Sequence, residues 1–557
     1  MKQRLFRSIV LAMVALLGVL PAVYPQQEKK PKAVTMEMAE LAQKIMGLNF
    51  DRAKLDSALE NLVEQLESFE KIRSIPLPNN IPPAILFNPI PVGFEFEKVK
   101  KPFKMSRPGK VMMPKNIEDL AFWSVGQLAE LIRTRKVRSE QLTIMYLNRL
   151  KKYGPKLECV VTLTEDLALK QAKQADKEIA KGKYRGPLHG IPFGVKDLLS
   201  VKGYKTTWGS VPYKDQVIDE DATVVKRLEN AGAVLMAKLT MGELAMGDVW
   251  FGGKTRNPWN YKQGSSGSSA GSASATAAGL VGFSIGTETL GSIVSPSTRC
   301  GTTGLRPTYG RVSRTGAMAL SWSMDKIGPI CRTVEDCALV LNAIYGPDGE
   351  DQTLYDAPFN YDPKVDWKKM RVGYLKMEFD SVRSNKAISD SVLTVLRKLG
   401  AQLIPIELPK LPVDGLRIIL SAEAAAAFDE LTRSGKDDLM VRQMKGAWPN
   451  SFRSSRFIPA VEYIEANRVR YLVIQEMQKL MKNIDVYVAP SFGGSNLLLT
   501  NLTGHPCVVL PDGFTKEGTP TSISFIGQLF GEAKLLAVAK QFQDATNYHL
   551  KHPNLEE

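Results

Sequence analysis

The chain has 557 residues, of which 44% are hydrophobic and 24% are charged, and its formal net charge is +15. These fractions are typical of a globular protein and exclude a disordered or fibrous chain. Five scattered cysteines without a Cys-x-x-Cys pair exclude a disulfide scaffold, and four histidines without a spacing such as His-Glu-x-x-His argue against a zinc hydrolase.

The N-terminus has the pattern of a secretory signal. Lys2, Arg4 and Arg7 precede an apolar run over residues 9–23, which is shorter than the roughly 20 residues of a membrane-spanning helix. We therefore expect a signal peptide over 1–22, a secreted or periplasmic protein, and no membrane span after cleavage. An uncleaved anchor is the alternative, because the run does not end in a clean small-x-small cleavage site.

Residues 23–116 are predicted to form an N-terminal extension. Apolar residues recur with helical spacing over 34–74, with a break near Asn49, which indicates a helical hairpin. A proline-rich connector follows over 76–91, and a basic stretch over 98–115 completes the extension. The basic stretch contains one aromatic residue, Phe103, and no series of interleaved aromatic residues, so we expect a solvated linker and no nucleic acid partner. The hairpin could cover an entrance or support a homodimer.

Residues 117–548 are predicted to form one large α/β domain, because helical and extended patterns alternate without a linker. The alternation favours a β-sheet that is covered by helices on both faces. The expected strands cover 160–163, 189–199, 233–237, 370–374, 402–406, 486–489, 507–510 and 521–526. The expected helices cover 124–132, 139–150, 165–180, 222–230, 334–345, 389–399, 422–431, 460–481 and 533–545.

A tract over residues 264–275 contains only glycine, serine and alanine. Such a tract is usually a flexible linker. A linker should separate two regions of different character, whereas the residues after this tract read as a small-residue helix followed by an apolar strand. We therefore expect the tract to be a structured part of the domain.

The same tract contains a Gly-x-Ser-x-Gly pattern centred on Ser269, which resembles the nucleophile elbow of α/β-hydrolases. In that interpretation Ser269 is the nucleophile of an esterase-like site, with a base among the downstream histidines His505, His549 and His552. The elbow must follow an apolar buried strand, but residues 255–263 are polar and turn-forming. This hypothesis is therefore the weaker one.

Two lysines lie in apolar strands. Lys196 ends the run Ile191–Lys196, and Lys238 ends a second such run. Burial lowers the pKa of a lysine from about 10.4, so that the neutral amine can act as a base without histidine. Either lysine could have this role, or Lys196 could instead pair with Asp197.

Several ordered motifs between about residues 118 and 546 resemble the amidase signature family. This resemblance implies a large mixed, twisted β-sheet covered by helices on both faces, and a metal-independent serine hydrolase without cofactor. The motifs that carry it are GPLHGIPFGVKD, GSSAGSASATAAGLVGFSIGTETLGSI, CGTTGLRPTYGRVSRTG, SWSMDKIGPICRTVEDCALVLNAIYGPDG and NLTGHPCVVLPDGF.

The resemblance also implies a Ser-Ser-Lys triad. Lys196 is the base, Ser268 the bridging serine after a cis peptide bond, and Ser292 the nucleophile, while Ser269 supports the network. The backbone N–H groups of four consecutive residues would form the oxyanion hole, and these residues are Thr289, Leu290, Gly291 and Ser292.

The sequence departs from the family pattern at two positions. Leu290 replaces the first glycine of a common Gly-Gly pair, and Glu288 stands where aspartate is usual. If position 290 requires a positive φ, leucine would cost about 1–3 kcal/mol. Neither change removes a triad residue, so we expect activity to survive.

The expected function is hydrolysis of a small carboxylic amide through an acyl-enzyme, with release of a carboxylate and ammonia or an amine. The alternative is a glutamine-hydrolysing amidotransferase A subunit, which the signal peptide argues against. A non-catalytic binding protein is the third class, and the intact triad argues against it. The segments 422–450 and 491–499 are expected to form the substrate pocket.

Overall fold

The computed structural model describes residues 34–106, 109–382 and 384–556. The chain divides into two compact units between Leu77 and Pro78. The signal peptide predicted over 1–22 lies outside the described residues. Among the described residues, no helix is long and apolar enough to cross a membrane.

The smaller unit contains the predicted helical hairpin, formed by α2 (Met36–Ile45) and α3 (Arg52–Arg73). Both helices begin at a polar cap, because the Thr35 side chain accepts a hydrogen bond from the Met38 N–H and Asp51 accepts one from the Lys54 N–H. The break that the sequence indicated near Asn49 therefore separates two capped helices.

The larger unit is built on one mixed sheet of eleven strands, which confirms the predicted α/β fold. β2 is parallel to β3 and β8, whereas β8 is antiparallel to β10. In spatial order the strands are β1 (Val160–Leu163), β3 (Val234–Leu239), β2 (Pro192–Lys196), β8 (Phe283–Glu288), β10 (Lys326–Cys331), β9 (Thr303–Arg306), β14 (Cys507–Phe514), β15 (Pro520–Gly527), β13 (Val486–Pro490), β11 (Arg371–Leu375) and β12 (Gln402–Ile406).

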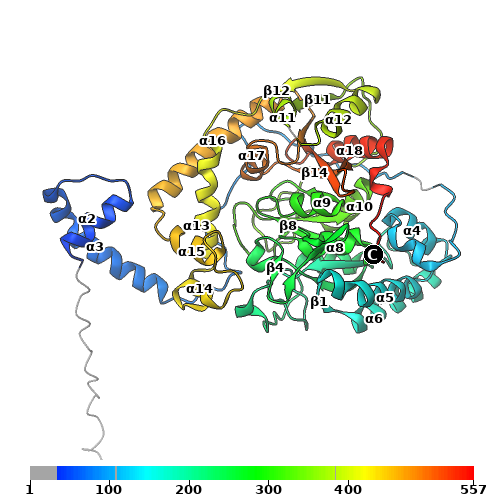
Figure 1. The fold of residues 1–557 in the computed structure, drawn as a ribbon, viewed down its shortest axis with the longest axis horizontal. Helices are drawn as coiled ribbons and strands as arrows, with labels where there is room; N and C mark the ends of the chain where they lie inside the picture. Colours follow the sequence, from blue (N-terminus) through cyan, green and yellow to red (C-terminus); the bar gives the residue numbers. More distant parts are fainter. Residues whose placement is uncertain (1–33, 107–108, 383, 557) are drawn as a thin grey trace, which may run out of the picture. The chain divides into compact units, whose positions relative to one another are not determined.

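Helices cover both faces of this sheet. As a result, every residue of the central strands β2, β3, β8 and β10 is buried. Figure 1 shows α5 and α6 beside the β1 edge, and α11 and α12 beside the β12 edge. The helices are α4 (Val125–Arg133), α5 (Ser139–Leu157), α6 (Glu165–Ala180), α7 (Thr223–Asn230), α8 (Ala270–Ala277), α9 (Val294–Cys300), α10 (Val334–Ile344), α11 (Lys376–Ser381), α12 (Lys386–Lys398), α13 (Arg417–Ala427), α14 (Asp429–Arg433), α15 (Trp448–Ser455), α16 (Ala460–Met481), α17 (Asn496–Thr503) and α18 (Glu532–Thr546).

The single helix predicted over 422–431 is instead two helices, α13 and α14, which meet at Phe428. The Phe428 ring is buried against Trp208 and Phe452, and its backbone φ of −121° is not helical. Tertiary packing of the ring therefore overrides the local helical pattern. The sequence did not predict β9 and β10, two strands of the main sheet, because their polar and proline residues interrupt the apolar pattern that is typical of a buried strand.

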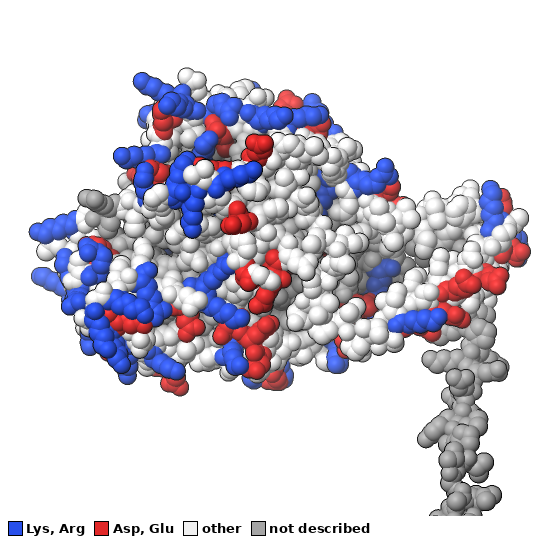
Figure 2. Space-filling model, turned by 180° about the vertical axis from the view of Figure 1, so that it is seen from behind, with Lys and Arg blue, Asp and Glu red and all other residues white. Residues whose placement is uncertain are grey.

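The basic stretch over 98–115 is partly neutralised within the larger unit. Lys101 contacts Glu97 at 2.5 Å, and Lys104 contacts Asp362 at 2.8 Å. On the face shown in Figure 2, lysine and arginine side chains are interspersed with aspartate and glutamate. This charge pattern is typical of a solvated protein surface.

Candidate active site

Lys196 lies at the carboxyl end of β2, where its side chain is fully buried. Its Nζ atom donates hydrogen bonds to Ser268 Oγ at 2.8 Å, to Thr287 Oγ1 at 2.8 Å and to Ser269 Oγ at 3.2 Å. Burial lowers the pKa of Lys196 to about 7, against the opposing effect of nearby acidic groups. A lysine with this pKa is neutral in a large fraction of molecules at neutral pH, and the neutral amine can accept a proton.

The tract over 264–275 is a packed element rather than a linker. The Gly267–Ser268 peptide bond is cis, and α8 begins at Ala270. A Cβ atom on Gly267 would lie 1.8 Å from the Gly247 carbonyl oxygen, and one on Gly271 would lie 2.4 Å from the Thr240 nitrogen. Small residues are therefore required because other backbone segments pass directly against the tract.

Ser292 follows β8, which ends at the same sheet edge as its parallel neighbour β2. This arrangement brings Ser292 close to the tract, and the Ser269 N–H donates to the Ser292 carbonyl oxygen at 3.2 Å. Ser292 is 7% exposed, whereas Ser268 is 1% and Ser269 is 0% exposed. Of these three hydroxyl side chains, that of Ser292 is the most accessible to a substrate.

The turn that contains Ser292 is held by Glu288, whose backbone precedes it and whose carboxylate binds the residues that follow it. The Glu288 carboxylate accepts from the N–H groups of Ile293 at 2.8 Å and Val294 at 2.9 Å, and it pairs with Arg306 at 2.8 Å. Burial raises the pKa of Glu288, but Arg306 and the backbone donors outweigh this effect and hold the pKa at about 2. Glutamate therefore acts here as an ionised anchor of the loop.

Leu290 does not incur the strain that a positive φ would cause. Among the described residues, those with a positive φ include Gly291, at 80°, but not Leu290. Gly291, the second residue of the common Gly-Gly pair, therefore has the left-handed backbone conformation. Leu290, the first residue of the pair, does not need it.

Thr289 is fixed by Asp325. The Thr289 hydroxyl donates to Asp325 Oδ1 at 2.5 Å, while Asp325 Oδ2 accepts from the N–H groups of Leu320 at 2.8 Å and Ser321 at 2.9 Å. Burial raises the pKa of Asp325, although these hydrogen bonds oppose the shift. Asp325 thereby ties the predicted oxyanion loop to the neighbouring 320–321 segment.

Lys238, the rival base, is bound in a different cluster. Its Nζ atom lies 3.0 Å from Asp197 Oδ1 and donates to Thr206 Oγ1 at 2.8 Å. Both side chains of the Lys238–Asp197 pair are fully buried. The charges of Lys238 and Asp197 balance each other. Lys238 therefore has an ionic partner, whereas Lys196 contacts the serines.

The elbow hypothesis for Ser269 has little geometric support. Ser269 Oγ donates to the Thr287 carbonyl at 3.0 Å and accepts from the Thr287 N–H at 3.1 Å, which is a supporting position beneath β8. β7 (Asn260–Gly264), the strand before the tract, belongs to a small two-stranded sheet. Two of the three candidate histidines have other contacts, namely His505 with Thr503 at 2.8 Å and His552 against the Phe122 ring at 4.0 Å.

Three further residues of this site have roles that could not be assigned from the sequence. Thr287 contacts the lysine amine, Asp325 orients Thr289, and Arg306 balances the charge of Glu288. Arg306 and Asp325 lie within the motifs already noted, but their partners are 18 and 36 residues away in sequence. Only the sheet topology brings these pairs together.

A cavity of about 310 Å³ opens beside Thr287 and Thr289. Among the described residues that line it, none comes from the segments 422–450 or 491–499 that were expected to form the pocket. Its walls come from residues 79–87, 309–327 and 350–353, with single residues from other loops.

Among the described residues, no group of three or more His, Cys, Asp or Glu side chains could hold a metal ion. The chemistry available in this site is that of hydroxyl groups, one buried amine and backbone N–H donors. These are the parts required for acyl transfer through a serine ester.

Comparison with known proteins shows which family the chain belongs to. The family model described as Amidase matches residues 141–500. The glutamyl-tRNA(Gln) amidotransferase A subunit of Methylococcus capsulatus is 34% identical over 479 residues, which cover 77% of this chain and 98% of that protein. The protein of the same name from Acinetobacter baumannii is 34% identical over 492 residues, covering 79% of this chain and 99% of that protein.

A solved structure gives a consistent result. The native peptide amidase from Stenotrophomonas maltophilia superposes with a TM-score of 0.71 at 30% identity, covering 79% of this chain and 100% of that chain. The predicted fold and the predicted class of enzyme are confirmed by these comparisons. The chain belongs to the amidase family and is an amidase-type enzyme.

Proposed function

We propose that this chain hydrolyses a carboxylic amide with Ser292 as nucleophile, Ser268 as proton relay and Lys196 as base. The observation that carries the proposal is the 2.8 Å contact between a fully buried lysine amine and the Ser268 hydroxyl. Deep burial without an ionic partner favours the neutral amine that a general base requires.

In the proposed first step, Ser292 Oγ bonds to the amide carbon and loses its proton to Ser268, whose own proton passes to Lys196. The carbonyl oxygen becomes an oxyanion that the N–H groups of 289–292 stabilise. The C–N bond then breaks, and the leaving nitrogen takes the proton back through Ser268. Water hydrolyses the resulting ester by the same relay, which releases the carboxylate and regenerates Ser292.

Two substrate classes fit this chemistry. The relatives with 34% identity are named as amidotransferase A subunits, so the comparisons favour a glutamine-hydrolysing protein of that kind more strongly than the stand-alone amidase expected from the sequence. The stand-alone amidase remains the second candidate, because a peptide amidase of known structure is matched over its full length. Ammonia release from glutamine and from simple primary amides, measured side by side, separates the two.

The proposal is tested by the substitution Ser292→Ala in the full-length protein. We expect amide hydrolysis to fall by about 10⁴-fold or more, as for loss of a serine nucleophile. Ser295→Ala provides a matched control, since Ser295 Oγ contacts Ser266 rather than the triad. Hydrolysis that persists unchanged in Ser292→Ala would overturn the assignment.

We also propose that the chain is exported, on the evidence of Lys2, Arg4, Arg7 and the apolar run over 9–23. Export would favour the stand-alone amidase over the amidotransferase subunit. N-terminal sequencing of the protein purified from its native cells tests this proposal. A mature N-terminus near residue 23 would support export, and an intact Met1 in a cytoplasmic fraction would contradict it.

A further inference from the structure

The proline-rich connector forms one wall of the cavity beside Thr287 and Thr289. This segment precedes the residues that the family model matches, which begin at residue 141. Its prolines fix φ and so favour an extended course along the rim. The residues of the connector that line the cavity are Asn79, Asn80, Pro82, Pro83, Ile85, Leu86 and Phe87.

Both ends of this wall are anchored to the larger unit. Asn79 donates to the Ala319 carbonyl at 2.9 Å and accepts from the Ala319 N–H at 2.7 Å. At the other end, the Phe87 ring packs edge-on against Tyr309 at 5.0 Å, and the buried Arg470 guanidinium lies 3.5 Å from its centroid. The wall is therefore held at two points by specific contacts.

The anchor at Asn79 is linked to the predicted oxyanion loop through the segment 319–320 and Asp325. Ala319 precedes Leu320, whose N–H donates to Asp325, and Asp325 accepts from Thr289. The connector thus contacts the same segment that holds Thr289, and its apolar side chains line the cavity that Thr287 and Thr289 also line.

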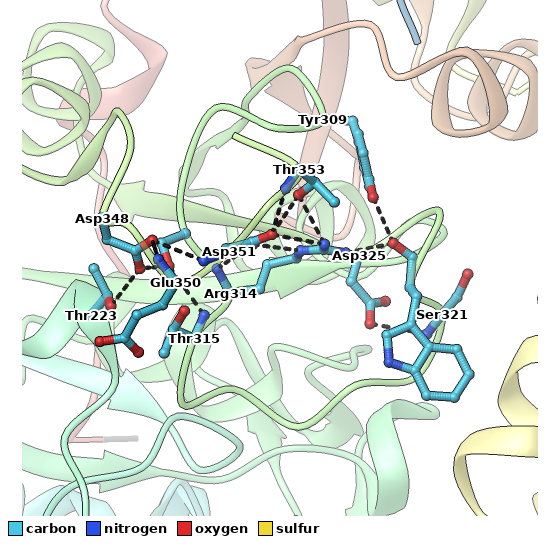
Figure 3. A network of polar contacts seen from close by, with 12 residues as sticks. Thr223, Tyr309, Arg314, Thr315, Ser321, Asp325, Asp348, Glu350, Asp351 and Thr353 are labelled. Atoms are coloured by element: carbon cyan, nitrogen blue, oxygen red, sulfur yellow. Dashed lines mark hydrogen bonds and ion pairs between the residues drawn. The ribbon is translucent and has the colours of Figure 1, made fainter. Parts of the chain in front are cut away.

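The charged groups in the cavity do not offer a cation to a substrate. Arg314 is held by Asp351 at 3.1 Å (Figure 3). It also donates to the Trp322 carbonyl at 2.5 Å. Lys326 is buried and donates to the Met324 carbonyl. Arg314 and Lys326 are the two cations among the described residues of the lining, so both are already engaged. Glu220, Glu350, Asp325 and Asp351 also line the cavity.

We propose that the connector makes this enzyme selective for carboxamides with an uncharged, apolar substituent. Substrates with a carboxylate, glutamine included, are disfavoured, so this inference favours the stand-alone amidase over the glutamine-hydrolysing candidate. The inference rests on the proposed amide hydrolysis. The apolar side chains of the connector provide contact area, while the excess of acidic groups and the absence of a free cation among the described lining residues repel an anion.

The wild-type enzyme is first tested with hexanamide and with adipic acid monoamide, which have the same chain length and differ by a terminal carboxylate. We expect kcat/KM to be at least about tenfold higher for hexanamide, which corresponds to about 1.4 kcal/mol. Equal values, or a preference for the monoamide, would overturn the charge argument.

The wall itself is tested with Leu86→Ala, and Ile81→Ala is the matched control. Both side chains belong to the connector and are similarly exposed, at 45% and 49%, but only Leu86 lines the cavity. We expect Leu86→Ala to lower the hexanamide-to-acetamide ratio of kcat/KM about fivefold through KM, and Ile81→Ala to leave it unchanged.

The outcomes separate the two proposals. Unchanged ratios in Leu86→Ala, in an enzyme that still hydrolyses amides, would overturn the role of the connector and leave the triad assignment standing. A wild-type enzyme that hydrolyses neither these amides nor glutamine would instead contradict the proposed function.

Discussion

Lys196 and Lys238 show how surroundings decide the chemistry of two similar residues. Lys196 is the last residue of β2 and Lys238 the last but one of β3, and burial lowers the pKa of each. Lys238 faces the carboxylate of Asp197 at 3.0 Å, whereas Lys196 faces hydroxyl groups. A lysine without an adjacent anion is the one suited to exchange a proton with serine.

The first prediction concerns pH. The pKa of Lys196 is lowered to about 7, and only the neutral amine accepts a proton. We therefore expect kcat/KM to rise with pH up to about 7 and then level off, so that activity at pH 5 is about 100-fold below the plateau. A pH–rate profile with an uncharged amide as substrate measures this rise in kcat/KM, which is the ascending limb of the profile.

His189→Asn is the control for this profile. His189 also titrates below neutral pH, since burial lowers its pKa, but it contacts Arg185 and Glu178 rather than the serines. An ascending limb that disappears in His189→Asn would contradict the assignment of the limb to Lys196.

The second prediction concerns Thr289, which we regard as a positioning residue through its hydroxyl. Thr289→Val removes the hydrogen bond to Asp325, so the oxyanion loop loses one anchor. We expect kcat to fall about tenfold, the equivalent of about 1.4 kcal/mol of barrier, with little change in KM.

Thr289→Ser keeps the hydroxyl and should restore most of the lost kcat. If the valine and serine variants have the same kcat, the bond to Asp325 does not position the loop.

At the scale of elements, the site depends on the close packing of α8 under the parallel strands β2 and β8. Gly286 lies over Ser269, where a Cβ would be 2.8 Å from Ser269 Oγ. Gly267 lies against the Gly247 carbonyl. The glycines and serines of the tract are thus a packing requirement, and the same packing brings Ser268 to Lys196.

Gly267→Ala should destabilise the fold, because the added Cβ would lie 1.8 Å from a backbone oxygen that cannot move freely. We expect a loss of about 3 kcal/mol or more of unfolding free energy. Gly446→Ala is the control, since no heavy atom lies within 4 Å of its added Cβ. Equal denaturant midpoints for the two variants would contradict the packing argument.

For the molecule as a whole, the proposed triad residues and their anchors come from a single compact unit that begins at Pro78. We therefore expect specific activity toward a simple amide to stay constant as the protein is diluted from micromolar to nanomolar concentration. An activity that falls on dilution, together with dissociation seen by analytical ultracentrifugation, would show that an active site needs a second chain.

Much of this architecture can be predicted from the sequence because it is local. The helix over 165–180 and the strand over 402–406 follow from periodicity alone. The family resemblance implies the triad of Lys196, Ser268 and Ser292, and the structure brings the Lys196 amine to 2.8 Å from the Ser268 hydroxyl. The cavity wall could not be predicted in this way. Asn79 bonds to Ala319 across 240 residues, and a proline-rich segment carries no sign of what it will cover.

The central claim is that Ser292, and not Ser269, attacks the amide. Labelling the full-length enzyme with a fluorophosphonate and locating the adduct by mass spectrometry tests it most directly, since this reagent reacts with an activated serine. We predict a single adduct on Ser292, which is lost in Lys196→Ala. An adduct on Ser269 would contradict the account and favour the hydrolase elbow.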